Sequence, residues 1–323
     1  MGAVNALVRR PLGSSGVEVS PMSLGSWLTY ERIPRETAVA ILARAREGGI
    51  DFLEVARYND RTGTAPMPTG YSEVVFGEVF RASGWPRDEV VIANKLWWEF
   101  WPQQTAAEEV DASLNRTGLD RFDFLYSDPP PARLALEDVV GAVGELIASG
   151  MARAWGIVNW PAERIAGACR AADASGIPRP CAAQLAYSLV RRSPVEDPDM
   201  VEVLRSFGLS VIASWVLAGG LLTGKYATPG TSGRMAEELD APRARPAVEA
   251  AARLRVLADA VGTTPAALAI AFALAKPNVA SVLFGATSPD QVDENLRAWD
   301  LIATLGPAQL AELERIGADA SQG

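Results

Sequence analysis

The residues of this chain that can move protons are carboxylic acids, tyrosines and lysines, because its 323 residues include no histidine. The segment FLYSDPPP has the apolar character of a buried strand, and it stops at Asp128 before three prolines. The segment GIDFLEVARYND contains Glu54 and Tyr58, and the segment VIANKLWW contains Lys95. Carboxyl, phenol and ammonium groups held at strand ends can serve as general acids and bases.

The composition excludes several kinds of catalytic and metal site. Without histidine there is no Ser-His-Asp triad, no HExxH zinc site and no phosphohistidine chemistry. The two cysteines, Cys169 and Cys181, lack the spacing of metal ligands, and one pair does not make a disulfide framework. We therefore expect no metal centre and a reduced, cytoplasmic protein.

Charge and hydropathy argue against nucleic-acid and membrane partners. The net charge of −9 opposes attraction to phosphate backbones and to anionic lipid surfaces. The longest apolar run, 266–275, has about half of the ~20 residues needed to cross a bilayer, so we expect a buried helix there. The N-terminal segment lacks the apolar region of a secretory signal. The partner we expect is a small-molecule substrate.

Short apolar segments alternate with amphipathic stretches along the chain, at the period of one strand-helix unit. The expected strands are 22–25, 51–56, 90–95, 122–128, 152–159, 182–189, 210–215 and 281–285. The expected helices include 35–49, 105–118 and 135–150, each ending on glycine. Eight such strands predict an α/β fold, a (β/α)8 TIM barrel that forms a single domain over residues 1–323.

Alternatives and accessory segments follow from the same pattern. A doubly wound open sheet would usually have a glycine-rich loop after its first strand, and GSWLTYERIP is not such a loop. The segments 58–70 and 225–246 are rich in glycine and proline and follow strand ends, so we predict that they are lids. Residues 9–22 predict a β-hairpin over the other end of the barrel. The acidic run EEVD at 108–111 is expected to be a solvated helix face.

Motifs along nearly the whole chain resemble those of the aldo-keto reductase superfamily, from RRPLGSSGVEVSPMSLGSW near the start to GATSPDQVDENLRA at 285–298. The resemblance implies a TIM barrel that binds NADP(H) extended across its C-terminal face. In VLAGGLLTGKY, which resembles the loop around the pyrophosphate, Gly219 and Gly220 let the backbone approach the phosphates. In GIVNW and AAQLAYSLVRR, Asn159 and Gln184 would bind the nicotinamide carboxamide.

The resemblance assigns a full set of cofactor contacts. The family often stacks an aromatic ring on the nicotinamide, and this chain has Ser214 at that position with Trp215 next to it, so stacking would need a shifted ring. The last helix would contact the adenosine end. The implied contacts are Asn159, Gln184, Ser214, Trp215, Leu217, Gly220, Leu222, Gly285, Thr287, Ser288, Gln291, Glu294 and Asn295.

The resemblance also assigns an altered catalytic tetrad. The family uses an Asp, a Tyr five residues later, a Lys that makes this Tyr more acidic, and a His. In this chain Glu54 replaces the Asp, Tyr58 follows four residues later with Asn59 at the family spacing, Lys95 matches, and Asp128 replaces the His. Family members that reduce carbon–carbon double bonds conjugated to a ketone likewise have an acid in place of that His.

Each catalytic assignment has an alternative. A protonated Asp128 would donate a hydrogen bond to a developing oxyanion. Alternatively, Asp128 only starts a turn, because Asp-Pro pairs favour turn initiation. The alternative for Glu54 and Lys95 is a structural ion pair in the mouth of the barrel, and the alternative for Tyr58 is one more aromatic residue of a loop.

Tryptophans gather at or just beyond the predicted strand ends, which predicts an aromatic-walled pocket for a ring-bearing or sugar-like substrate. The predicted walls are Trp27, Trp97, Trp98 and Trp160. The sequence therefore predicts an NADP(H)-dependent oxidoreductase that reduces a carbonyl or a conjugated enone. One alternative is a barrel that keeps NADP as a sensing or structural ligand and acts through a partner. Another is a non-redox lyase, dehydratase or isomerase that uses Glu54, Lys95 and Asp128.

Overall fold

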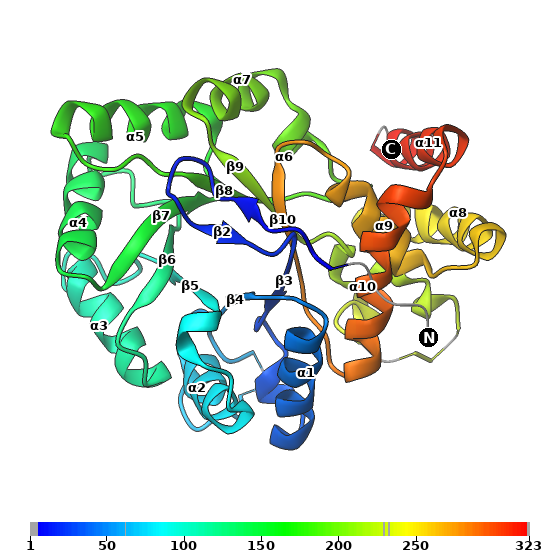
Figure 1. Ribbon diagram of the computed structural model, residues 1–323, viewed down its shortest axis with the longest axis horizontal. Helices are drawn as coiled ribbons and strands as arrows, with labels where there is room; N and C mark the ends of the chain where they lie inside the picture. The colour runs from blue at the N-terminus through cyan, green and yellow to red at the C-terminus, as the bar shows by residue number, and fades with distance from the viewer. Residues whose placement is uncertain (1–5, 62, 229, 232, 322–323) are drawn as a thin grey trace.

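Eight parallel strands form a closed barrel in the computed structural model, with helices outside it (Figure 1). The strands are β3 (Met22–Gly25), β4 (Phe52–Glu54), β5 (Val91–Leu96), β6 (Phe122–Ser127), β7 (Ala152–Val158), β8 (Ala182–Ala186), β9 (Ser210–Ser214) and β10 (Val279–Phe284). Around the barrel they follow the order β10, β3, β4, β5, β6, β7, β8, β9. The predicted TIM barrel is confirmed. The structure describes residues 6–61, 63–228, 230–231 and 233–321.

Helices connect the strands and cover the outside of the barrel. They are α1 (Arg35–Glu47), α2 (Tyr71–Ser83), α3 (Ala106–Thr117), α4 (Leu136–Ala148), α5 (Ala162–Ser175), α6 (Ser193–Glu196), α7 (Pro198–Phe207), α8 (Arg245–Val261), α9 (Pro265–Leu274), α10 (Pro289–Thr304) and α11 (Pro307–Ser321). Short 3-10 helices cover Tyr30–Arg32, Arg87–Glu89, Ala218–Thr223, Lys225–Ala227, Ala236–Glu238 and Pro242–Ala244.

Local sequence signals set the ends of α3. Thr105 and Glu108 form a capping box at its N-terminus, which satisfies two backbone donors that the helix leaves free. Gly118 ends the helix with a φ of 68°, a left-handed conformation that glycine adopts without strain. The start of α3 therefore follows from sequence chemistry, and its end follows from the glycine that the sequence pattern pointed to.

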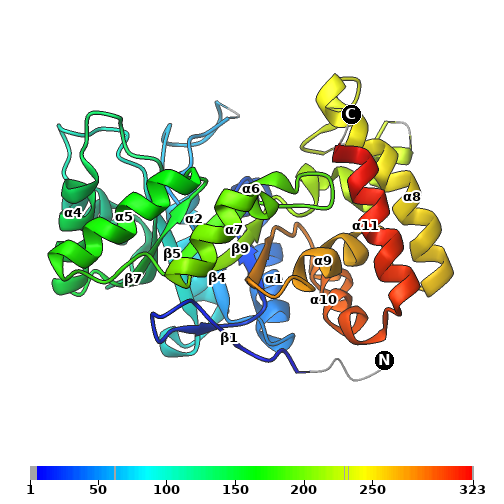
Figure 2. The same ribbon diagram turned by 90° about the horizontal axis from the view of Figure 1, so that it is seen from above.

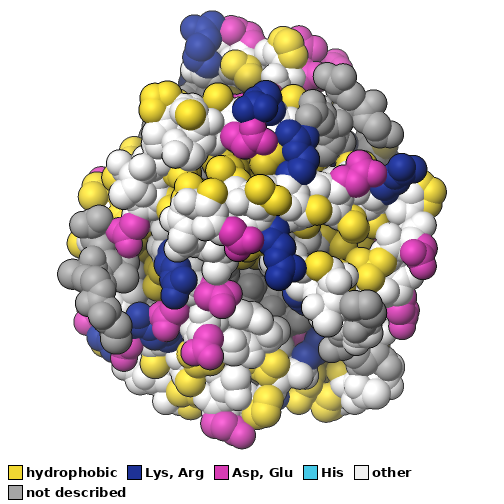
Figure 3. All heavy atoms as spheres, turned by 90° about the vertical axis from the view of Figure 1, so that its right-hand side faces the viewer, with side chains coloured by type: hydrophobic (Ala, Val, Ile, Leu, Met, Phe, Trp, Pro, Cys, Tyr) yellow, Lys and Arg dark blue, Asp and Glu magenta, His cyan; other side chains and the backbone are white. Residues whose placement is uncertain are grey.

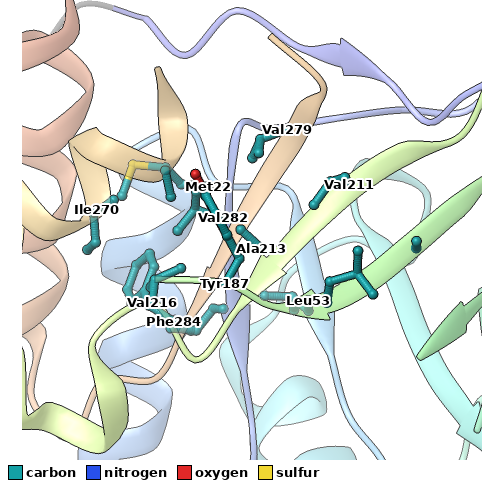
Figure 4. Close-up of a cluster of buried hydrophobic side chains, with 14 of the residues drawn as sticks. Met22, Leu53, Tyr187, Val211, Ala213, Val216, Ile270, Val279, Val282 and Phe284 are labelled. Carbon is teal, nitrogen blue, oxygen red and sulfur yellow. The ribbon is translucent and has the colours of Figure 1, made fainter. Parts of the chain in front are cut away.

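Two layers of buried side chains fill the protein, because residues along each strand point alternately into and out of the barrel. Phe52, Ala93, Phe124 and Tyr126 belong to the inner cluster. Their neighbours Leu53, Ile92 and Leu125 belong to the outer cluster, which packs under the helices. Figure 4 shows part of this outer layer, where Val211 and Ala213 of the strand β9 lie beside Val279 and Val282 of its neighbour β10.

The predicted N-terminal hairpin closes one end of the barrel. Its strands β1 (Arg10–Pro11) and β2 (Glu18–Val19) pair in antiparallel orientation. Leu12, Val17 and Val19 join the cluster inside the barrel, so the hairpin acts as a hydrophobic plug. Figure 2 shows the hairpin on the side opposite to the long loops that follow the strands. The loops therefore surround the other, open end.

Helix α9 is the buried helix predicted at 266–275, and its residues from Ala266 to Leu274 are all buried. Among the described residues, no helix by itself has the length and apolar character of a membrane span, although the pair Pro242–Val261 and Pro265–Leu274, bent by 94°, passes that test together. The face in Figure 3 carries basic and acidic side chains interspersed with apolar ones.

Candidate active site

A cavity of about 1010 Å³ lies at the carboxyl ends of the barrel strands. All eight strands contribute a residue in or just beyond their carboxyl-terminal halves: Gly25, Glu54, Lys95, Asp128, Asn159, Gln184, Ser214 and Phe284. The two loops predicted as lids contribute Arg61 and Arg234. The carboxyl face is where TIM barrels hold their active sites.

Glu54, Tyr58 and Lys95 form one hydrogen-bonded group on the floor of this cavity. The Tyr58 hydroxyl donates to Glu54 Oε1 at 2.6 Å, and Lys95 Nζ donates to the Tyr58 hydroxyl at 2.8 Å. Lys95 Nζ also lies 3.0 Å from Glu54 Oε2. Gln184 Nε2 donates to the same oxygen at 2.6 Å. The sequence predictions are therefore brought together in space, and Gln184 joins them.

Strand alternation explains why these side chains meet. Glu54 lies two residues beyond Phe52 and Lys95 lies two residues beyond Ala93, and both Phe52 and Ala93 point into the barrel. Strands β4 and β5 are neighbours and pair Glu54 with Ala93. The two charged residues therefore occupy the uppermost inward-facing positions of adjacent strands.

The charges of this group fix the state of each member. Burial raises the pKa of Glu54, but the Lys95 ammonium and the hydrogen bonds from Tyr58 and Gln184 outweigh it, so the pKa lies below its ordinary value. Burial and the adjacent Glu54 carboxylate raise the pKa of Tyr58 well above its ordinary value. The net shift is therefore opposite to the more acidic Tyr that the family resemblance implies. Because the single hydroxyl hydrogen of Tyr58 is bound to Glu54, its oxygen presents a lone pair to the cavity.

Asp128 follows β6 directly and lies beside the end of β5, where its backbone N–H donates to Leu96 O at 2.9 Å. Burial raises the pKa of its half-buried carboxyl to about 6, with Lys95 lowering it and Glu109 raising it. No turn is assigned at Asp128 or at the three prolines after it, and the turn comes only at Pro131–Leu134, where the Leu134 N–H donates to Pro131 O at 2.9 Å. Asp128 is therefore a cavity carboxyl whose pKa is raised by burial, and it does not start a turn.

A row of aromatic rings lines the cavity. Trp215 lies 5.7 Å from Trp27, Trp27 lies 6.3 Å from Tyr58, and Tyr58 lies 5.8 Å from Trp97, as distances between ring centroids. Trp27, Trp97 and Trp215 are cavity residues. Trp215 therefore supplies an aromatic ring next to Ser214, which stands at the predicted stacking position and has no ring.

Two of the four tryptophans predicted as pocket walls do not line the cavity. Trp98 and Trp160 are 3% and 1% exposed and belong to the outer core under the helices. Trp98 has a φ of 60°, and Asn159, just before Trp160, has a φ of 51°. These left-handed residues redirect the chain where the strands end, so the simple alternation of side chains no longer applies.

The predicted cofactor residues line the cavity, except for Leu222 and Ser288. Leu222 is fully buried in the outer core. Ser288 is instead the N-cap of α10, where its side chain accepts from the Gln291 backbone N–H at 3.4 Å. Both corrections arise because a motif gives the position of a loop but not the direction of each side chain.

Backbone features of the cavity wall suit close approach by a ligand. Gly219 and Gly220 have φ values of 70° and 97°, and a Cβ on Gly219 would lie 2.8 Å from Met235 Cγ. Gln184 Oε1 is buried without a hydrogen-bond partner, which is costly unless something else donates to it. Asn159 Oδ1 accepts from the Ala186 backbone N–H at 3.0 Å, which leaves its amide group free to donate.

Several basic residues of the cavity were missed at the level of sequence. They are Arg57, Arg61, Arg191, Lys225 and Arg234. Lys225 and Arg191 lie inside the quoted motifs, so their charge was the available signal. Arg234 donates to Trp27 O at 2.9 Å and lies 4.5 Å from the Trp27 ring. It lies outside the cofactor motifs but within the segment 225–246 that was predicted as a lid, so its charge in that segment was the available signal.

The barrel and the cavity at its carboxyl face define a TIM-barrel protein with an enzyme-like site of nucleotide size. A model of the aldo/keto reductase family matches residues 21–318 of the chain. The chain therefore belongs to the aldo/keto reductase family.

Three similar proteins have names that mention an ion channel. A probable voltage-gated potassium channel subunit beta of Arabidopsis thaliana is 32% identical over 320 residues, which cover 94% of this chain and 95% of the relative. A protein of the same name from Oryza sativa subsp. japonica has the same identity and coverage. A putative voltage-gated potassium channel subunit beta of Schizosaccharomyces pombe is 31% identical over 328 residues, covering 95% and 92%.

Proposed function

We propose that this protein is an NADP(H)-dependent oxidoreductase that reduces a carbonyl or a conjugated enone of a small ring-bearing or sugar-like substrate. The observation that carries the proposal is the hydrogen-bonded group of Glu54, Tyr58 and Lys95 beside Asp128 on the floor of the cavity. We also infer that residues 1–323 form one domain and that the protein is cytoplasmic, in keeping with two buried cysteines that are not paired.

The residues of the cavity fit a dinucleotide in three places. Gln184 Oε1 is a buried acceptor that lacks a donor, and a carboxamide N–H group would satisfy it. The backbone at Gly219 and Gly220 would approach the phosphates, and Lys225 lines the same cavity. Gln291 and Asn295 of α10 would hold the adenosine end. When bound, NADPH supplies the hydride of the reduction.

Asp128 is the proton donor of this proposal. Its pKa of about 6, raised by burial, keeps part of the carboxyl protonated at neutral pH. Tyr58, whose hydroxyl hydrogen is bound to Glu54, would instead hold Lys95, whose remaining N–H would donate to the substrate oxygen. In the reduction of a carbonyl, the hydride would be added to the carbonyl carbon and the proton of Asp128 to the oxygen. In the reduction of an enone, the hydride would be added to the double bond and the proton of Asp128 to the resulting enolate.

The aromatic row favours a flat or ring-bearing substrate. Trp27, Tyr58 and Trp97 present ring faces and edges on one side of the cavity, and such surfaces stack on sugar and aromatic rings alike. Arg61 lies 5.7 Å from the Trp27 ring and extends this wall from the loop above. The proposed class of substrate is based on this aromatic wall. The proposed reduction of a carbonyl or an enone is based on Asp128 as the proton donor.

Titration and rapid kinetics test the proposal together. Binding of NADPH is measured by the change of its fluorescence, with NADH as the comparison, and the bound cofactor is then mixed with a panel of ring-bearing ketones, aldehydes and enones. We expect tight NADPH binding and loss of NADPH absorbance with at least one member of the panel. No binding of either cofactor would point to a non-redox enzyme and overturn the proposal.

A second candidate function is favoured by the comparisons. The three relatives, whose length is matched over 92–95%, are named as potassium channel beta subunits. This chain would then bind NADP as a sensing ligand and act through a partner protein. Tight NADPH binding without oxidation by any compound of the panel would favour this function over the reductase.

A further inference from the structure

Glu109 of α3 is a buried carboxylate next to the proposed catalytic group. It lies in the acidic run EEVD, which the sequence pattern assigns to a solvated helix face, but its residue is only 4% exposed. One of its oxygens accepts from the Trp97 backbone N–H at 2.7 Å, and the other accepts from the Trp98 backbone N–H at 3.1 Å. Both oxygens therefore bind the turn that follows Lys95.

This turn needs support because it bends out of the strand. Trp98 has a φ of 60°, a left-handed conformation that is strained for a bulky residue. Two successive backbone N–H groups there point away from the strand ladder, where they would be costly without a partner. The Glu109 carboxylate satisfies both, and it does so as a charge-assisted acceptor. Its removal would loosen the end of β5.

The same turn also holds the backbone around Asp128. The indole Nε1 of Trp98 donates to Ser127 Oγ at 2.9 Å, and Ser127 Oγ donates to Asp128 O at 3.1 Å. The Asp128 N–H also donates to Leu96 O at 2.9 Å, between Lys95 and the turn. A continuous chain of hydrogen bonds therefore leads from Glu109 through Trp98 and Ser127 to Asp128.

We propose that Glu109 is a positioning residue of the active site, whose carboxylate fixes the turn after Lys95 and, through Trp98 and Ser127, the placement of Asp128. This inference rests on the proposed role of Asp128 as the proton donor. Glu109 does not line the cavity, so it acts on the substrate only through these residues.

Charge gives Glu109 a second effect at the same place. Lys95 and Glu109 are the charged groups that act on Asp128, with opposite signs, after the effect of its burial. Burial raises the pKa of Glu109 above its ordinary value and Glu73 of α2 adds to this, while the Trp97 and Trp98 backbone N–H groups and Arg57 favour the charged form. A negative Glu109 therefore opposes the ionisation of Asp128, and neutralising it should let Asp128 lose its proton at lower pH.

Two substitutions separate the two effects. Glu109→Gln keeps the size of the side chain but removes the charge and turns one acceptor into a donor facing a backbone N–H. Glu109→Asp keeps the charge but shortens the reach to Trp97 and Trp98. We expect Glu109→Gln to lower the titration midpoint of Asp128 by about 0.5 to 1 unit. We expect Glu109→Asp to slow single-turnover hydride transfer by about tenfold or more while moving the midpoint less.

The control is Asp123→Asn in the same strand as Asp128. Asp123 is 2% exposed, accepts from the Ile92 backbone N–H at 2.9 Å and pairs with Arg87 at 2.8 Å, near the opposite end of β6. Like Glu109, Asp123 is therefore a buried carboxylate that accepts from a backbone N–H, but it has no contact with the site. We expect it to lower the melting temperature and to leave the Asp128 midpoint unchanged.

The midpoint is measured by carbon-13 NMR of protein labelled at the aspartate carboxyls, with Asp128→Asn to assign the signal, and the rate by stopped-flow oxidation of NADPH. An Asp128 midpoint that is the same in wild type and Glu109→Gln, together with a Glu109→Asp rate equal to wild type, would overturn the inference. If no substrate is ever reduced, the proposed function fails, but the NMR titration still decides whether Glu109 controls Asp128.

Discussion

Replacing Asp128 by asparagine is expected to slow hydride transfer and to remove its dependence on pH. The wild-type carboxyl has a pKa of about 6, raised by burial. Its protonated fraction is then about nine tenths at pH 5 and about one tenth at pH 7. If the protonated form is the reactive one, the rate of wild type should fall about tenfold between these two pH values, and again about tenfold by pH 8.

The size of the loss depends on pH for the same reason. Losing a general acid costs about 10²- to 10⁴-fold in rate, and this full loss should be seen near pH 5, where the wild-type acid is intact. At pH 7 only about one tenth of the wild-type molecules have a protonated Asp128, so the loss of rate there should be about 10- to 10³-fold. Asparagine can donate a hydrogen bond but cannot release a proton, so Asp128→Asn should show a flat profile.

The assay is single-turnover oxidation of bound NADPH, followed from pH 5 to 8 in buffers of constant ionic strength. NADPH affinity, measured in the same buffers, should be nearly the same in both proteins, because Asp128 is assigned to the proton and not to the cofactor. A variant that keeps the wild-type slope would show that another group titrates. A variant as fast as wild type at pH 5 would refute the role of Asp128.

Three further predictions follow from the same geometry. Tyr58→Phe, which removes the hydroxyl between Lys95 and Glu54, should slow single turnover by at least about tenfold, whereas Asn59→Ala should change it little; equal effects would place Asn59 in the site instead. Trp97→Ala should raise KM for a ring-bearing substrate, whereas Trp160→Phe, in the outer core, should cost about 1 to 3 kcal/mol of stability in urea unfolding and leave KM unchanged. Because the folded-state pKa of Asp128 is raised from 3.8 to about 6, its contribution to stability is complete below the lower value and is lost as pH rises to the higher one. Urea unfolding should therefore show Asp128→Asn gaining about 1 to 2 kcal/mol relative to wild type between about pH 4 and pH 6, with no further gain above it.

The period of the sequence gives the fold and the positions of the charged residues at the strand ends. Eight apolar segments at the spacing of strand-helix units predict a closed parallel barrel, and the inward alternation along β4, β5 and β6 places Glu54, Lys95 and Asp128 on its upper rim. The hairpin is also legible, because Leu12, Val17 and Val19 flank turn residues and need an apolar surface to cover. These features depend on local patterns that repeat.

Side-chain directions beyond the strand ends are not legible in the same way. Trp98 and Trp160 follow strands as Trp97 does, but left-handed residues turn them into the outer core. Glu109 looks like part of a solvated acidic run, yet the packing of α3 under the end of β5 buries it against two backbone N–H groups. Such positions depend on contacts between elements that lie far apart in the chain, which no local pattern encodes.

The protonation of the catalytic group is a further property that only the assembled site determines. A Glu in place of an Asp is one methylene longer, and here its Oε1 reaches the Tyr58 hydroxyl directly. Sequence spacing shows the exchange, but the consequence, a tyrosine whose hydrogen is held by a carboxylate, needs the distances. In the proposed function, this contact is the reason why the proton comes from Asp128 and not from Tyr58.

The most direct test of the account is the transfer of hydrogen from the cofactor to a substrate within one enzyme-bound turnover. NADPH carrying deuterium at the transferred position of its nicotinamide is bound to the protein and mixed with the ketone and enone panel. The account predicts that at least one product carries deuterium on the reduced carbon and that its formation is slower than with unlabelled NADPH. Bound NADPH that stays unoxidised with every member of the panel would contradict it.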